Sequence, residues 1–141
     1  MINRILLRQL PARVTTGAYV LNSGVGKLHA DQQAAESMQG WAASTYPVLG
    51  KLDPQQFARL LAAGEITTGV LLLVPLVPAV VAGAALTGFA AGLLGLYLRT
   101  PGMRKRGSLR PTEEGISLAK DVWLLGIGLS LVLDDATRED R

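Results

Sequence analysis

The feature that most constrains this chain is a long apolar stretch from Phe57 to Leu98, which contains only two charged side chains, Arg59 and Glu65. A continuous helix of that length would extend about 63 Å, roughly twice the ~30 Å hydrocarbon thickness of a bilayer. The stretch is therefore too long for one membrane crossing and suits two. One kinked helix inside a soluble protein is the alternative, but the rest of the chain offers too little material to cover it.

Two prolines, Pro75 and Pro78, interrupt this stretch in the sequence VPLVP. Each proline removes a backbone N–H donor and disfavours helix immediately before it. The pattern predicts a helical hairpin with membrane spans over about residues 55–74 and 78–98. Asp53 and Pro54 suit the N-cap and the first position of the earlier helix.

Two less apolar segments, over about residues 11–28 and 115–133, are predicted to complete a four-helix bundle. The first contains small or polar residues at four-residue spacing, a pattern typical of close helix contact in lipid. This predicted seam is Ala18, Asn22 and Gly26, and similar seams are expected at Ala84, Gly88, Gly92, Gly126 and Ser130. The first ten residues are predicted to form a separate amphipathic lead at the membrane surface.

The connections between the spans also carry structural signals. Residues 31–46 are polar with apolar side chains at helical spacing, which predicts an amphipathic helix along the membrane interface with Trp41 and Tyr46 as anchors. An exposed linker is the alternative. The loop of residues 99–111 carries five basic and no acidic side chains, which favours the cytoplasmic side for this loop and the outside for both termini, although arginines near the N-terminus favour the reverse.

These features together predict a single all-α integral membrane domain over residues 1–141: a four-helix bundle with an interfacial helix between spans one and two. Ten of its basic residues are arginine against four lysines, and alanine and glycine are abundant. This usage is typical of GC-rich bacteria, so the expected location is the bacterial plasma membrane, with multiple crossings.

Several ionisable side chains lie within the predicted spans, although a charge at a helix centre costs ~2.5–3.5 kcal/mol. Four of them fall at one membrane depth and are expected to form a buried polar network: Glu65, Lys120, Asp121 and Lys27. Such a network either fixes packing alone, binds a ligand such as a quinone head group, or transfers protons. Arg13 lies toward the opposite membrane face and is expected to meet lipid head groups or the Pro75 turn.

The chain contains no cysteine and one histidine. Thiol catalysis, cysteine-ligated metal centres and histidine clusters are therefore excluded within it. We predict no catalytic residues and no metal site. The basic residues flank membrane segments without interleaved aromatic side chains, which argues against nucleic-acid binding. The expected contacts are membrane lipid and a protein partner or a second copy of the chain.

Short motifs in three predicted spans resemble the DoxX family of small four-helix membrane proteins. They are Gly17…Asn22-x-Gly24-x-Gly26-Lys27, Gly64-Glu65…Gly69 and Ala119-Lys120-Asp121. The resemblance covers about residues 10–134, and its specificity comes from the order and helix positions of the motifs. It implies a relationship to the membrane subunit of thiosulfate:quinone oxidoreductase and to mycobacterial members of an oxidoreductase assembly with superoxide dismutase and a sulfurtransferase. It also implies a shared polar site at Glu65, Lys120 and Asp121.

We therefore expect a membrane subunit that anchors or assists a redox complex without complete catalytic machinery of its own. The alternative is a quinone- or lipid-binding oxidoreductase component that uses the buried polar network, with quinone as the candidate cofactor. A small transporter is a third hypothesis, disfavoured because four helices leave little room for alternating access and no inverted repeat is evident.

Overall fold

The computed structural model describes residues 4–113, 115–119 and 121–137. Within these ranges the fold is all-α, as predicted, and the one β feature is an isolated bridge between Arg104 and Pro111. The helices are α1 (Arg4–Leu28), α2 (Gln32–Thr45), the short 3₁₀ helix η1 (Pro47–Lys51), α3 (Pro54–Leu73), α4 (Ala79–Arg99), α5 (Ile116–Ala119) and α6 (Val122–Ala136).

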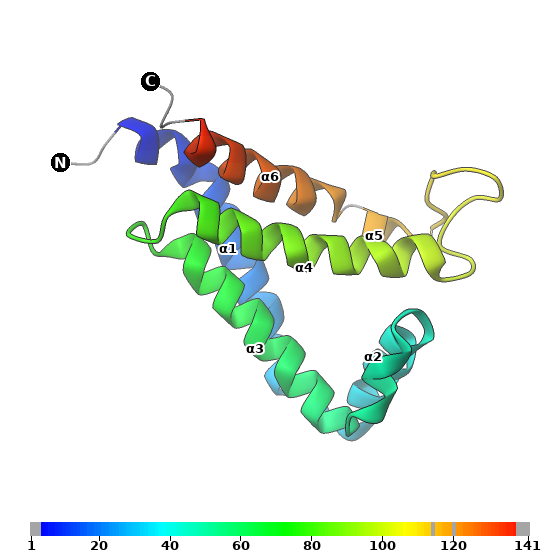
Figure 1. The fold of residues 1–141 in the computed structure, drawn as a ribbon. Helices are drawn as coiled ribbons and strands as arrows, with labels where there is room; N and C mark the ends of the chain where they lie inside the picture. Colours follow the sequence, from blue (N-terminus) through cyan, green and yellow to red (C-terminus); the bar gives the residue numbers. More distant parts are fainter. Residues whose placement is uncertain (1–3, 114, 120, 138–141) are drawn as a thin grey trace.

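The four long helices pack as two antiparallel pairs, α1 against α3 and α4 against α6 (Figure 1). The pairs meet near the turn between α3 and α4 and diverge toward the opposite end. Helix α1 begins and α6 ends beside this turn, whereas α2 and the loop of residues 99–111 lie at the diverging end (Figure 1). The pairs therefore form two arms joined at one end.

Glycines bring the backbones within each arm close together. On α1, a methyl group in place of Gly17 or Gly24 would lie 2.9 Å from Leu73 Cγ or 2.8 Å from Ile66 Cγ1 of α3. Gly69 of α3 packs equally closely on the backbone of α1. In the other arm, Gly83 of α4 and Gly128 of α6 face each other, and a methyl group at Gly83 would lie 2.6 Å from the Gly128 carbonyl oxygen. Each arm is thus a tightly interlocked unit.

The small-residue seam predicted on α1 was wrong. Ala18, Asn22 and Gly26 are all exposed, and the contact with α3 is made one or two positions away, through Gly17 and Gly24. Gly88, Gly92 and Gly126 also have no atoms near the position of an added methyl group. Spacing identifies a row of small residues on a helix. Which row makes the contact depends on the side chains of the helix that packs against it.

Arg13 of α1 fastens the C-terminal end of α3. Its Nε donates to the Leu72 carbonyl oxygen at 2.9 Å, and its Nη2 donates to those of Leu71 at 2.8 Å and Val74 at 3.0 Å. In a continuing helix, the Leu71 and Val74 oxygens would accept from residues 75 and 78, which are prolines without an N–H. Arg13 therefore supplies donors that the prolines remove, and of its two expected positions, the lipid head groups or the Pro75 turn, the structure shows the turn.

The end of α6 is held at the same turn. The Asp134 carboxylate accepts hydrogen bonds from Arg8 and Gln9 of α1, and Asp135 accepts one from the Val80 N–H at the start of α4, at 3.0 Å. These contacts keep the first part of α1 in line with the rest of the helix. The predicted separation at Pro11 was wrong, because α1 runs without a break from Arg4 through Pro11 to Leu28.

The predicted helix over residues 115–133 is divided in the structure. Helix α5 ends at Ala119 and α6 begins at Val122. Between them Asp121 has φ −66° and ψ −8°, closer to a turn than to regular α-helix. Both α5 and α6 contact α4, and α6 is the longer helix that forms the second arm with it (Figure 1).

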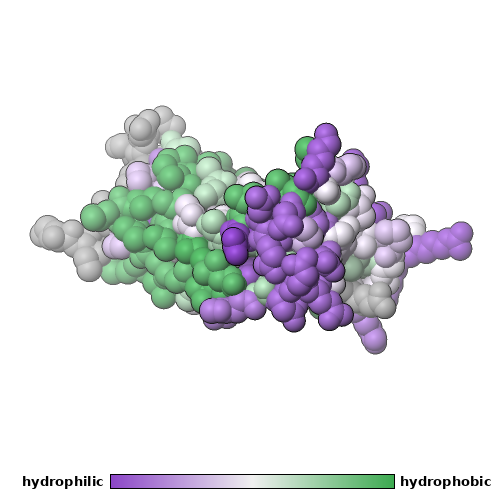
Figure 2. Space-filling view, turned by 90° about the horizontal axis from the view of Figure 1, so that it is seen from below, coloured by the Kyte–Doolittle hydropathy of each residue, from purple (hydrophilic) through white to green (hydrophobic). Residues whose placement is uncertain are grey.

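Two described helices, α3 and α4, are long and apolar enough to cross a membrane. Apolar side chains of the arms also remain exposed, among them Val81 of α4 and Leu129 and Leu133 of α6. Figure 2 shows hydrophobic surface gathered toward the joined end of the arms, and hydrophilic surface toward the end that carries α2 and the 99–111 loop. An apolar exterior of this kind suits contact with lipid.

Candidate functional site

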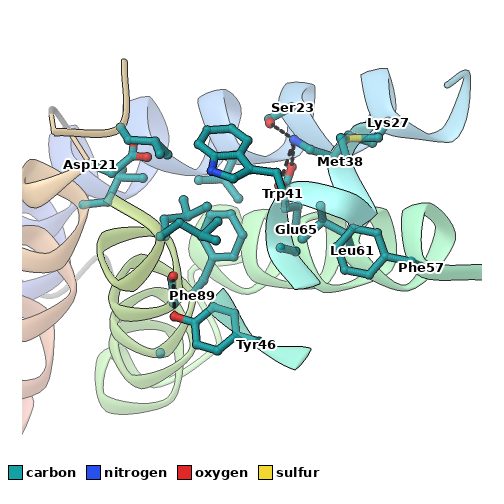
Figure 3. A pocket seen from close by; sticks show the side chains of 18 of the residues that line it. Ser23, Lys27, Met38, Trp41, Tyr46, Phe57, Leu61, Glu65, Phe89 and Asp121 are labelled. Atoms are coloured by element: carbon teal, nitrogen blue, oxygen red, sulfur yellow. Dashed lines mark hydrogen bonds and ion pairs between the residues drawn. The ribbon is translucent and has the colours of Figure 1, made fainter. Parts of the chain in front are cut away.

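A cavity of about 480 Å³ lies between the arms and is bordered at the diverging end by α2 (Figure 3). Its walls are mainly apolar and aromatic. The aromatic lining residues are Tyr19, Trp41, Tyr46, Phe57 and Phe89. The volume falls in the range of ~300–1,000 Å³ typical of small-molecule sites, which also combine apolar walls with a few polar groups.

An ion pair joins the two helices of the first arm at the cavity wall. Lys27 Nζ of α1 lies 2.9 Å from Glu65 Oε1 and 3.0 Å from Oε2, and donates to Ser23 Oγ at 2.8 Å. The Glu65 side chain is 2% exposed and that of Lys27 is 25% exposed. Ser23 and Lys27 share a face of α1 because they are four residues apart. Glu65 is thus held deep in the wall, while Lys27 remains partly accessible.

The close approach of α1 and α3 makes this ion pair geometrically available. Gly24 lies between Ser23 and Lys27 in sequence and packs against Ala62 and Ile66, which flank Glu65 on α3. A side chain at this point would force the helices apart. The interlocked glycine therefore sets the spacing at which the lysine reaches the carboxylate.

Helix α2 is fastened to α4 by two aromatic side chains that also line the cavity. Tyr46 Oη donates to the Gly92 carbonyl oxygen at 2.8 Å, and Trp41 Nε1 donates to Thr100 Oγ1 at 2.8 Å. Sequence reasoning assigned both side chains to the membrane interface. It missed their contacts with α4, because the α2–α4 contact is non-local and leaves no trace in the spacing of either segment.

The four predicted network residues have different positions. Lys27 and Glu65 are in direct contact. Asp121 is 7% exposed and lines the same cavity, but it comes from the second arm and lies away from the ion pair (Figure 3). Lys120 lies outside the described residues. The structure thus brings together one acid–base pair and places a second carboxylate on another wall of the same space.

The chemistry of the cavity suits a ligand with a polar head and an apolar body. The Lys27 ammonium has three N–H donors and borders the cavity beside the Ser23 hydroxyl. Its charge is already compensated by Glu65. Among the described residues, no group of three histidine, aspartate or glutamate side chains gathers in a way that could hold a metal ion. A carbonyl or hydroxyl group is therefore a better match for this wall than a phosphate.

Comparison with known proteins identifies one relationship. The DoxX family model matches residues 9–99, a region that includes most of α1, all of α2, α3 and α4, and the Lys27–Glu65 pair. No curated protein and no solved structure matches the chain. Because the matched region covers more than half of the 141 residues, the chain belongs to the DoxX family.

Proposed function

We propose that this chain is a membrane component of a redox assembly and that it binds a neutral, tailed ligand, such as a quinone, between its two arms. It would present this ligand to partner proteins without completing a catalytic cycle of its own. The proposal unites the anchoring role and the ligand-binding role that the sequence left as alternatives.

The mainly apolar cavity with the Lys27–Glu65 pair in its wall is the observation that carries this proposal. A space of about 480 Å³ lined by aromatic rings offers an apolar ligand favourable burial at ~25 cal/mol per Å² of apolar surface. Lys27 offers an N–H donor to a head-group carbonyl, and its pairing with Glu65 holds the ammonium in a fixed position. This combination favours an amphiphile over a wholly polar metabolite.

The pairing of the cation in the wall favours a neutral head group. Lys27 already faces Glu65 at 2.9 Å. A phosphate group entering this space would meet a base whose charge is already compensated, and its own desolvation would be poorly offset. A quinone has no formal charge and two carbonyl acceptors, so it avoids this cost.

We further propose that α1, α3, α4 and the α5–α6 segment all cross a bacterial plasma membrane, with α2 along its interface. The four long helices form two antiparallel pairs, which puts the 99–111 loop and α2 on one side and the α3–α4 turn on the other (Figure 1). Five basic side chains in the loop favour the cytoplasm for its side. Thiol accessibility of single cysteines introduced in the loop and the turn tests this topology.

Tryptophan fluorescence offers a direct test of ligand binding. The chain has two tryptophans, and Trp41 lines the cavity. In a Trp123→Phe variant, Trp41 is therefore the only source of tryptophan fluorescence. In lipid nanodiscs, a decyl-tailed benzoquinone should quench Trp41 saturably. A Lys27→Met variant should weaken this binding about tenfold. Quenching that only rises linearly with quinone, as expected for random collision in the bilayer, would contradict the proposal.

The ordered 99–111 loop supports the additional role in partner binding. Tyr97 Oη donates to the Leu109 carbonyl oxygen at 2.6 Å, and the Thr112 N–H donates to that of Met103 at 3.0 Å. These bonds hold Arg104, Lys105 and Arg106 exposed on one shaped loop. Replacement of these three by glutamine should abolish co-purification of an acidic protein partner in mild detergent. If the wild-type chain purifies alone, this part of the proposal fails.

A further inference from the structure

The cavity between the arms adjoins a groove on the outside of the molecule. Tyr19 of α1, together with Asp121 and Leu124 beside and on α6, lines both the cavity and a second hollow of about 290 Å³. Thr15 and Thr16 line the second hollow and not the cavity. The cavity and the second hollow therefore adjoin at the boundary between α1 and α6 and share wall residues there.

A third hollow extends the second one along the same two helices. It shares Trp123 and Ile127 with the second hollow and reaches Ala12 on α1 and Leu131 on α6. From Tyr19 to Ala12, and from Leu124 to Leu131, each helix advances about 10 Å. We call the two outer hollows together the α1–α6 groove. It adjoins the cavity at Tyr19 and Leu124 and runs for roughly two helical turns.

The looseness of this boundary follows from how the arms are built. Within each arm, glycines interlock the backbones, whereas α1 and α6 belong to different arms and touch little. Gly126 on α6 lines the groove, and a methyl group there would meet no atom within 4 Å. At the α2 end, the Tyr46 and Trp41 hydrogen bonds tie α2 to α4. Arg8 and Gln9 of α1 bond to Asp134 of α6 at the joined end of the arms, whereas the groove lies between Ala12 and Tyr19, farther toward the diverging end. Along the groove, the α1–α6 boundary is thus the less restrained side of the cavity.

We infer that the α1–α6 groove is the lateral portal through which the ligand reaches the cavity from the membrane, and that the ligand's hydrocarbon tail lies in it. This inference rests on the proposed function and narrows the ligand class to neutral molecules with an alkyl or prenyl tail. The head occupies the cavity beside Lys27. The tail passes between Tyr19 and Leu124 and lies along Trp123 and Ile127, where it gains apolar contact on both helices.

Gly126 allows the groove to be filled without disturbing a helix contact. In the Trp123→Phe background, which keeps an aromatic ring in the groove, Trp41 quenching gives the affinity for two probes in nanodiscs: a decyl-tailed benzoquinone and the same benzoquinone without the tail. Gly126→Leu should weaken the tailed probe at least about tenfold and leave the tail-free probe unchanged. Gly64→Leu is the matched control, because Gly64 is an exposed glycine of α3 that also has open space; it should change neither affinity.

A second measurement detects the tail by its position in the groove and does not compare affinities. The chain has no cysteine, so Gly126→Cys introduces a single thiol into the groove. The tailed benzoquinone should slow the reaction of this thiol with an uncharged maleimide, and the tail-free benzoquinone should not.

The outcomes separate this inference from the proposed function. If neither probe quenches Trp41 saturably, the proposed function fails and the portal fails with it. If both probes bind and Gly126→Leu weakens both equally or neither, the proposed function stands and the tail lies elsewhere. Equal protection of the Gly126→Cys thiol by both probes would likewise overturn the portal.

Discussion

Two cations of α1, Arg13 and Lys27, both bond to α3, yet they lie in different kinds of surroundings. Arg13 is 2% exposed and donates to three backbone carbonyl oxygens at the end of α3. Lys27 pairs with one carboxylate and borders a cavity. A buried charge whose partners are backbone atoms completes the fold, whereas a partly exposed charge beside a cavity is accessible to a ligand in the proposed function. This difference distinguishes the two cations within one helix.

Loss of Arg13 should have the largest effect on stability. Arg13→Met removes three charge-assisted hydrogen bonds and leaves the Leu71 oxygen without the donor that Pro75 lacks, so the free energy of unfolding should fall by about 4 kcal/mol. Unfolding in mixed detergent micelles measures this loss. Arg13→Lys should recover only a small part, because one ammonium cannot reach three carbonyls with the planar geometry of a guanidinium. Full recovery of the unfolding free energy by lysine would mean that the three carbonyl contacts of Arg13 do not set it apart from Lys27.

Loss of the Lys27–Glu65 pair should have a smaller structural effect and a larger effect on binding. Lys27→Met and Glu65→Leu should each destabilise by about 2–3 kcal/mol, because each leaves one charge unpaired. The double variant should lose less than the sum, with a coupling of about 1–2 kcal/mol. Additive losses would show that the two side chains act independently. Glu36→Gln, at an exposed acid of α2, is the control for charge removal.

The attachment of α2 should contribute less again. Tyr46→Phe removes the hydrogen bond to the Gly92 oxygen and should cost about 1 kcal/mol. Hydrogen exchange in α2 should rise while exchange in α1 and α3 stays unchanged. Tyr19→Phe provides the comparison, because Tyr19 also lines the cavity but is 52% exposed. If Tyr19→Phe loosens α2 equally, the Tyr46 bond is not what holds it.

Loss of Arg8 should have the smallest effect on stability, and Arg8 serves as the exposed cation of α1 against which Arg13 and Lys27 are compared. Its ion pair with Asp134 involves a side chain that is 54% exposed, so Arg8→Ala should cost less than about 1 kcal/mol, and added salt should reduce the difference further. Thermal unfolding at low and high salt checks this. A loss as large as that of Arg13 would mean that exposure does not decide the contribution of a charge here.

Local signals predicted much of the fold. The prolines at 75 and 78 predicted the turn between α3 and α4. Asp53 was expected as an N-cap, and its side chain accepts from the Gln55 and Gln56 N–H groups. Arg13 was expected either at lipid head groups or at the Pro75 turn, because it sits at the depth of both. These features depend on residues adjacent in sequence or on counting turns along a helix, so one sequence suffices for them.

Non-local features were not predictable in the same way. The contacting row on α1 was misassigned because Gly17 and Gly24 are seven residues apart, a spacing less conspicuous than Ala18, Asn22 and Gly26. The attachment of Tyr46 to Gly92 depends on how α2 folds back over α4. The groove between α1 and α6 forms because these two helices pack loosely against each other. A single sequence does not indicate which pairs of helices pack loosely.

The contact between Arg13 and the α3–α4 turn also bears on how the protein is assembled in the membrane. In the proposed topology, in which α1 crosses the membrane, the Arg13 charge and the Leu71 carbonyl oxygen, whose helical donor is missing at Pro75, are each unfavourable in hydrocarbon, where no water can satisfy them. Their union removes both costs in one step. The first helix is synthesised before the hairpin, so it must wait at the membrane until the residues of the turn emerge. Biogenesis of this protein is therefore expected to proceed by joint insertion of α1 with the hairpin, and truncation before Val74 should leave α1 unable to stay inserted.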